Sequence, residues 1–181
     1  MASSVEPAAN RPGASLMLGR RRRSNESGHR PKFLVVIDDT EECDRALYFA
    51  ARRAMRTNSG VSLLAVVDPA GFNEWLGVGS VIQQEAEEAA SSMLNRAAMR
   101  AREISGIQPD LVMKSGPRSE QILQLIEEDE DISFLVLAAS SSVDGPGPLV
   151  STLAAKSSGT FPVPIVIVPG AMTDEEIEAL A

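Results

Sequence analysis

The sequence has few of the side chains on which most catalytic and metal sites depend. Its 181 residues include one cysteine and one histidine, and aromatic residues make up only 4% of the chain. The single cysteine, Cys43, excludes an intramolecular disulfide and a cysteine-based zinc site, which agrees with a reducing compartment. The single histidine, His29, precedes the region with folded patterning, so that region has no Ser–His or Cys–His pair. We expect no catalytic residues and no metal site.

Long hydrophobic runs are also missing. No apolar run approaches the roughly 18 residues needed to cross a bilayer. The arginine run at 20–23 is not followed by the apolar segment of a secretory or twin-arginine signal. We therefore expect a cytoplasmic protein without a transmembrane segment.

Charge is divided unevenly along the chain. Residues 1–32 hold seven Lys or Arg against two Glu, which is net +5 and leaves −13 for the rest of a chain whose total is −8. An acidic body argues against general nucleic-acid binding by the folded domain. Residues 1–31 lack apolar periodicity, so we expect a disordered basic tail there. A solvated tail, an organelle transit peptide and a basic arm that touches lipid or nucleic acid are the alternatives.

From Lys32 onwards, short aliphatic runs alternate with longer amphipathic stretches. Hydrophobic residues make up 44% of the chain, so the core must consist mainly of Val, Ile, Leu, Ala and Met. Five runs are apolar enough to be buried on both faces, which is typical of a parallel sheet. They lie at 33–38, 61–67, 110–114, 133–139 and 163–168.

Helical stripes separate these runs, at 41–57, 81–105, 118–129 and 148–158. This alternation predicts an α/β fold, an open twisted parallel sheet with right-handed crossovers and helices on both faces, over residues 32–170. Residues 171–181 predict a short C-terminal helix, in which Thr173 and Glu176 have the spacing of a capping box. That helix has three possible packing surfaces: its own domain, a second copy of the chain or another partner.

Open α/β sheets bind ligands at the carboxyl ends of their strands. Asp38, Asp39 and Thr40 follow the first strand, where they have the chemistry to bind a ribose, hold a divalent cation or cap the next helix. The loop that follows Leu137, in the stretch 139–152, is rich in small residues and leads into a helix. It suits either an anion site or a plain turn that uses its glycines for geometry.

The ordered motifs resemble those of the universal stress protein family. They are VVIDDTEECDRAL at 35–47, AVVDP at 65–69, KSGPRSEQIL at 114–123, and FLVLAASSSVDGPGPLVST leading to PVPIVIVP. The resemblance implies a Rossmann-like, adenine nucleotide alpha hydrolase-like sheet of five strands in the order 3-2-1-4-5. It also implies a homodimer and, in one branch of the family, an ATP or AMP site, with magnesium accompanying ATP.

The nucleotide-binding motif of that branch is degenerate here. The pattern G-x-x-G, nine residues, then G-[ST] falls on Ala138, Ser141, Ser151 and Thr152, and only Thr152 conforms. Replacement of the glycines adds atoms where the backbone would approach phosphate, and it disfavours positive φ.

The resemblance also assigns contacts to a bound nucleotide. Asp38 would face the ribose, Val66 or Val67 would offer its backbone to adenine, and Ser141, Ser151 and Thr152 would meet phosphate. Leu137 and Ala138, at the end of the fourth apolar run, complete the expected cofactor-binding set.

Two other fold families share parts of this pattern. A phosphorelay receiver also begins with a strand that ends in paired aspartates, but it needs an Asp after its third strand and a Lys after its fifth. LVMKSGP and IVIVPG stand there instead. A Rossmann dehydrogenase needs G-x-G-x-x-G where this chain has IDDTEE.

Two apolar segments suggest contact surfaces. The strand at 163–168 predicts an exposed sheet edge that a second copy would cover, unless the C-terminal segment folds over it. Phe72, Trp75 and Leu76 form an apolar group that suits a lid, a partner surface or simple anchoring.

The sequence therefore predicts a homodimeric stress-response or regulatory binding module without its own catalysis, with an unknown protein partner. The alternatives are an ATP or AMP sensor that uses Asp38 and the loop after Leu137, and a weak ATPase.

Overall fold

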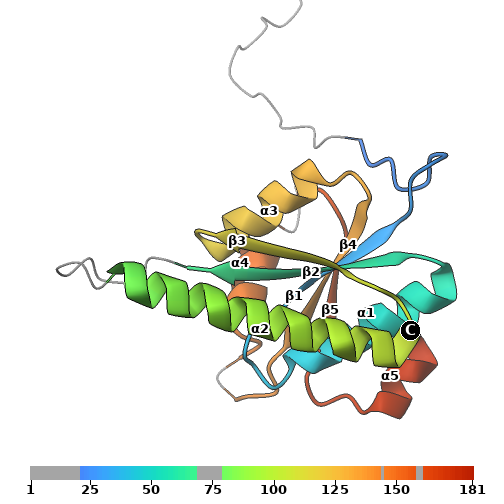
Figure 1. The fold of residues 1–181 in the computed structure, drawn as a ribbon. Helices are drawn as coiled ribbons and strands as arrows, with labels where there is room; N and C mark the ends of the chain where they lie inside the picture. Colours follow the sequence, from blue (N-terminus) through green and yellow to red (C-terminus); the bar gives the residue numbers. More distant parts are fainter. Residues whose placement is uncertain (1–20, 69–78, 144, 158–160) are drawn as a thin grey trace, which may run out of the picture.

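The computed structural model describes residues 21–68, 79–143, 145–157 and 161–181, in which strands and helices alternate (Figure 1). All strand pairs are parallel, and the sheet order is β3-β2-β1-β4-β5. The predicted fold class and strand order are therefore confirmed. The strands are β1 (Lys32–Val36), β2 (Gly60–Val67), β3 (Asp110–Ser115), β4 (Ile132–Ala139) and β5 (Ile165–Pro169). The helices are α1 (Cys43–Thr57), α2 (Gly79–Ser105), α3 (Arg118–Glu128), α4 (Pro148–Ser157) and α5 (Asp174–Leu180).

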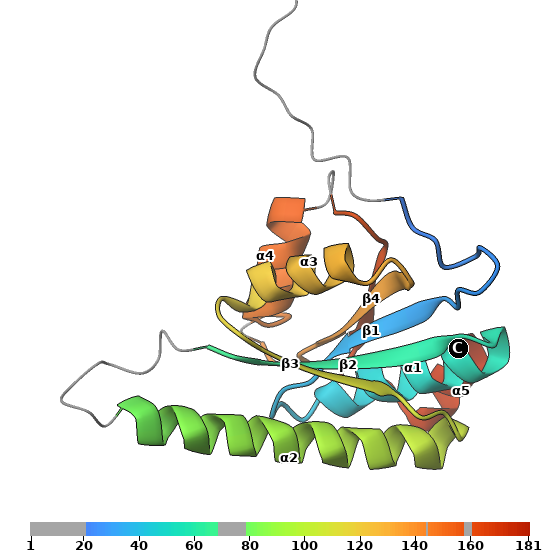
Figure 2. The ribbon, with the colours of Figure 1, turned by 45° about the horizontal axis from the view of Figure 1, so that its top comes forward.

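Helices cover both faces of the sheet, with α1, α2 and α5 on one side and α3 and α4 on the other (Figure 2). Successive side chains of a strand point to opposite faces, so β1 supplies both layers. Phe33 and Val35 belong to the core under α1 and α2, whereas Leu34 and Val36 belong to the core under α3 and α4. This double burial explains why the central strands carry no polar alternation. None of the described helices is long and apolar enough to span a membrane.

The two edge strands differ from the expectation that all five strands are buried on both faces. In β3, Leu111 and Met113 are 41% and 45% exposed, and in β5 Ile167 is 44% exposed. Within the described residues, each edge strand has a neighbouring strand on one side only, and the helices pack mainly over the central strands. Apolar composition therefore did not distinguish an edge strand from a central one.

Residues 21–31, which belong to the predicted tail, contact the folded domain. The Arg22 guanidinium donates to the carbonyl oxygens of Ile126 and Asp129 at the end of α3. His29 Nδ1 lies 2.6 Å from Asp131 Oδ1, and Ser24 is buried. The last carbonyl groups of a helix lack intrahelical partners and carry partial negative charge, so they attract a cation.

Helix α5 packs on α1 of the same chain, a location that the sequence left open. The predicted capping box is confirmed, because Thr173 and Glu176 exchange side-chain and backbone hydrogen bonds. Ile177 is 0% exposed and belongs to the core. Around it, Tyr48 Oη donates to Glu178 over 2.9 Å, and the Arg52 guanidinium also donates to Glu178. A buried apolar contact inside a charged ring therefore holds α5 in place.

Candidate functional site

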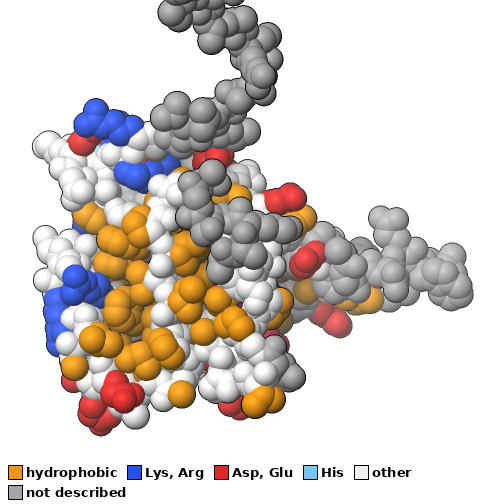
Figure 3. Space-filling view, turned by 180° about the vertical axis from the view of Figure 1, so that it is seen from behind, with side chains coloured by type: hydrophobic (Ala, Val, Ile, Leu, Met, Phe, Trp, Pro, Cys, Tyr) orange, Lys and Arg blue, Asp and Glu red, His pale blue; other side chains and the backbone are white. Residues whose placement is uncertain are grey.

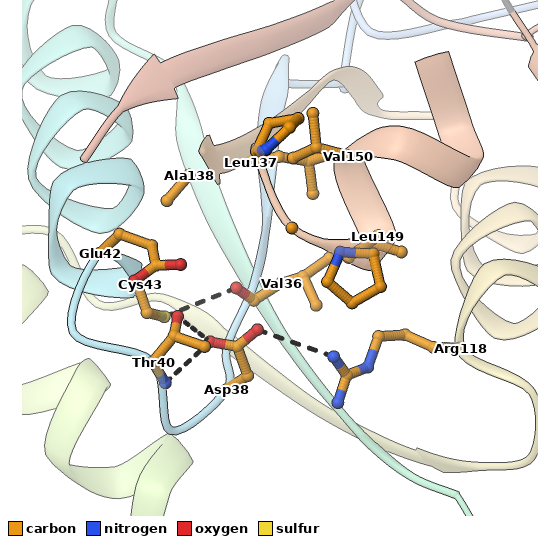
Figure 4. A pocket seen from close by; sticks show the side chains of 13 residues that line it. Val36, Asp38, Thr40, Glu42, Cys43, Arg118, Leu137, Ala138, Leu149 and Val150 are labelled. Atoms are coloured by element: carbon orange, nitrogen blue, oxygen red, sulfur yellow. Dashed lines mark hydrogen bonds and ion pairs between the residues drawn. The ribbon is translucent and has the colours of Figure 1, made fainter. Parts of the chain in front are cut away.

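A small pocket lies at the carboxyl ends of β1 and β4, where the strand order reverses and where open α/β sheets bind ligands. Its volume is about 90 Å³. Figure 4 shows Asp38 and Arg118 facing each other across the pocket. The lining residues are Val36, Asp38, Thr40, Glu42, Cys43, Arg118, Leu137, Ala138, Pro146, Gly147, Pro148, Leu149 and Val150.

Hydrogen bonds within its own loop fix Asp38 in place. Thr40 donates to Asp38 Oδ1 from its hydroxyl over 2.6 Å and from its backbone N–H over 3.2 Å. The helix-cap alternative is not realised, because the N-cap residue of α1 is Glu42 and no side chain caps that helix. Asp38 is therefore presented to the pocket as a held carboxylate, with Oδ2 turned away from Thr40.

Arg118 supplies the opposite charge, and the sequence-based prediction missed it. Its Nη1 lies 3.7 Å from Asp38 Oδ2. Arg118 begins α3 directly after Pro117, at the carboxyl end of β3, so it reaches the same edge of the sheet as Asp38. The motif KSGPRSEQIL contains a signal for Arg118. A proline is common at the start of a helix, so the residue after Pro117 lies in the first turn of a helix that begins at the carboxyl end of the sheet.

Cys43 contributes a wall of the pocket and no reactive thiol. Its Sγ lies 3.7 Å from the Val36 carbonyl oxygen, and the residue is buried. Burial raises the pKa of the Cys43 thiol from 9.0 to about 11, because the charged thiolate loses its hydration. A thiol with so high a pKa stays protonated near neutral pH and is a poor nucleophile.

The loop after β4 uses its glycines for turn geometry. Gly145 and Gly147 have φ values of 111° and 95°, a region that other residues rarely adopt. The Ser140 N–H donates to the Pro146 carbonyl over 3.2 Å, which closes the turn, and α4 begins at Pro148. Proline at the first helical position needs no further explanation. The loop geometry therefore matches the plain-turn alternative.

The predicted site residues divide into two groups. Asp38, Leu137 and Ala138 line the pocket together. The other five lie outside its lining: Val66, Val67, Ser141, Ser151 and Thr152. The Val67 carbonyl accepts a 2.9 Å bond from the Gly116 N–H, so this oxygen is already engaged. Ser141 and Ser151 are exposed to solvent.

Two further expectations concern neighbouring regions. Phe72, Trp75 and Leu76 lie in 69–78, outside the described residues. Among the residues that the structure describes, no group of three or more His, Cys, Asp or Glu side chains is arranged to hold a metal ion.

Comparisons with known proteins agree on one family. A family model described as the universal stress protein family matches residues 29–169. The solved structure of universal stress protein UspA from Lactobacillus plantarum has a TM-score of 0.64 at 16% identity, over 76% of this chain and 97% of that one. No curated protein sequence matches the chain.

Two other solved structures are complexes with nucleotides. A universal stress protein from Archaeoglobus fulgidus in complex with dAMP has a TM-score of 0.54 at 17% identity, over 76% of this chain and 96% of that one. A universal stress protein in complex with cAMP has a TM-score of 0.52 at 17% identity, over 78% of this chain and 98% of that one. At these identities, the likeness shows a shared fold.

Proposed function

Because the chain belongs to the universal stress protein family, we propose that it is a homodimeric regulatory binding protein that works by docking to partners. It needs no bond chemistry and acts in the cytoplasm, where a free thiol such as Cys43 persists in reduced form. The observation that carries this proposal is the open apolar edge at β5.

Strand β5 pairs with β4 on one side, and its Ile167 side chain is 44% exposed. Seen from behind the view of Figure 1, hydrophobic side chains gather over a broad area of the surface (Figure 3). An uncovered apolar edge strand is an aggregation hazard that natural proteins cover. The same strand of a second copy, related by a two-fold axis, would extend the sheet and bury this edge.

Sedimentation velocity at micromolar concentration tests the dimer. We expect a dimer for the native chain and a monomer for Ile167→Asp, because a carboxylate would be desolvated in the interface. Leu111→Asp is the matched control, since Leu111 is 41% exposed on the opposite edge strand β3. A monomeric native chain, or an equal loss of dimer in the control, would show that β5 is not the interface.

The candidate cleft supports a function that does not depend on nucleotide. A volume of about 90 Å³ is well below the 300–1,000 Å³ that is usual for small-molecule sites. The Asp38–Arg118 pair closes it, and serine and alanine replace the glycines that the nucleotide-binding branch places near phosphate. A nucleotide must therefore separate this ion pair before it can bind.

An ATP or AMP sensor is the second candidate, favoured by the dAMP and cAMP complexes of relatives and by the held carboxylate of Asp38. Calorimetric titration of the full chain with AMP, and with ATP in the presence and absence of magnesium, distinguishes the sensor from the nucleotide-independent function. We expect no saturable binding by the native chain. Saturable binding that Asp38→Ala removes would establish the sensor and overturn the nucleotide-independent function.

A weak ATPase is the third candidate, and it requires that the chain binds ATP. Phosphate release from ATP with magnesium is the measurement, and we expect none above the rate without protein. Turnover that Asp38→Ala abolishes would show catalysis in this cleft.

A further inference from the structure

A larger groove lies at the opposite end of the sheet from the Asp38 pocket. It has a volume of about 540 Å³, within the usual range for small-molecule sites. Its walls come from the amino-terminal halves of β1 and β4, the second half of α1, the end of α5 and the segment before β1. The lining residues are Asn25, Pro31, Phe33, Phe49, Arg53, Thr57, Ser59, Ser133, Phe134, Val166 and Leu180. It shares no residue with the pocket at Asp38.

Two stacked rings form a rigid apolar wall of this groove. Phe33 and Phe134 are direct partners in the parallel ladder of β1 and β4. Their ring centroids lie 5.2 Å apart at an interplanar angle of 14°. Phe33 is only 4% exposed, so backbone pairing and core packing both hold the ring. The apolar surface that faces the groove therefore comes mainly from Phe134, which is only partly buried and which stacks on the fixed Phe33 ring.

The charge of the groove is unusual for this acidic protein. The chain carries a net charge of −8, yet among the described residues no Asp or Glu lines the groove, and Arg53 is the only charged one that does. The other arginines of α1 are engaged: Arg45 pairs with Asp44 and Asp174, Arg52 with Glu178, and Arg56 donates to carbonyl oxygens of α5 and its last cap.

The Arg53 guanidinium, by contrast, makes no hydrogen bond or ion pair within the described part of the chain. The lining hydroxyl groups already have partners. Thr57 donates to the Arg53 carbonyl oxygen, Ser59 lies 2.9 Å from Thr57, and Ser133 donates to Asp131. Among the described lining residues, the side-chain donors without a partner in the described part of the chain are therefore the Asn25 amide and the Arg53 guanidinium, of which only Arg53 is charged.

From this arrangement we infer that the groove binds an amphipathic monocarboxylate, a molecule with an apolar body and one carboxyl group. A guanidinium group offers two parallel N–H donors that match the two oxygens of a carboxylate. The apolar body lies against Phe33 and Phe134 and leaves water as it enters. Absence of acidic lining residues removes the repulsion that a carboxylate meets elsewhere on this surface.

Calorimetric titration of the full chain with sodium decanoate, kept below its micelle concentration, tests the inference. We expect saturable binding of decanoate, no detectable binding of acetate, and at least about ten-fold weaker binding of decylammonium, which has the same chain and the opposite charge. Arg53→Gln should weaken decanoate binding about ten-fold or more. Arg102→Gln, an exposed arginine of α2, should leave it unchanged.

Leu180→Glu gives a second variant, since Leu180 is 64% exposed on the rim and its replacement does not threaten folding. A carboxylate there should weaken decanoate binding by competing for Arg53. The inference is wrong if decanoate fails to bind, if decylammonium binds equally well, or if Arg53→Gln binds like the native chain. Absence of binding together with a shift of the sedimentation coefficient in Leu180→Glu would assign the groove to a second copy of the chain. These outcomes are independent of the nucleotide titrations and of the Ile167→Asp test.

Discussion

Replacement of Ile177 by alanine should destabilise the whole domain, although α5 has only seven residues. Ile177 is 0% exposed and contacts the core beneath α1. The substitution removes three carbon atoms, which contribute about 0.8 kcal/mol each by transfer from water. The cavity left behind adds to this loss, so we expect the free energy of unfolding to fall by about 2.5–4 kcal/mol.

Leu180→Ala is the matched control, because Leu180 lies one turn later on the same helix and is 64% exposed. Its replacement should change the free energy of unfolding by less than about 0.5 kcal/mol. Urea unfolding followed by circular dichroism measures both variants, and an unchanged m-value indicates a shared unfolded state. Similar losses for the two variants, or a loss below about 1 kcal/mol for Ile177→Ala, would refute the view that α5 completes the core.

Three more predictions follow from single features. The folded state holds the Cys43 proton more tightly than the unfolded chain does. The free energy of unfolding should therefore fall as pH rises from about 9 to about 11. Urea unfolding at a series of pH values measures this fall, which should be smaller in Cys43→Ala. Gly170→Ala places a Cβ 2.7 Å from a backbone carbonyl oxygen, so it should lower the melting temperature more than Gly60→Ala, whose Cβ has a side-chain carbon at 3.2 Å as its nearest neighbour and a backbone oxygen at 3.8 Å. Equal melting temperatures would argue against this close approach. Deletion of residues 1–31 should lower the free energy of unfolding by about 1–2 kcal/mol more than deletion of residues 1–20, because only the longer deletion removes the hydrogen bonds to the end of α3. Equal stability of the two variants in urea would contradict those contacts.

Local periodicity was sufficient to predict the order of elements. The apolar runs correspond to the five strands within two residues, and the helical stripe predicted at 41–57 corresponds to α1 (Cys43–Thr57). These signals are local, because a strand or helix that packs on a sheet needs apolar residues at fixed spacing. The resemblance to the universal stress protein family added the strand order, which periodicity alone does not contain.

The contacts that periodicity missed join residues far apart in the sequence. Arg22 reaches Ile126 over 104 positions, and composition alone assigned that part of the chain to a disordered tail. Arg118 lies near Asp38 because the carboxyl ends of the parallel strands β1 and β3 point the same way in the sheet. A charged side chain carries no local mark of its distant partner. The pocket lies at the end of the sheet where the sequence predicted a site, and Asp38, Leu137 and Ala138 line it together with Arg118, which the sequence-based prediction did not include.

The packing of α5 on α1 has a consequence for synthesis of the chain. Arg52 and its partner Glu178 are 126 positions apart. At roughly 5–20 residues per second, a ribosome needs about 6–25 s to cover that distance. Throughout this interval α1 has emerged without the residue that fills its outer surface. Because Arg52 and Arg56 are charged, we expect this surface to stay hydrated until α5 arrives, and the same two side chains then hold α5 in place.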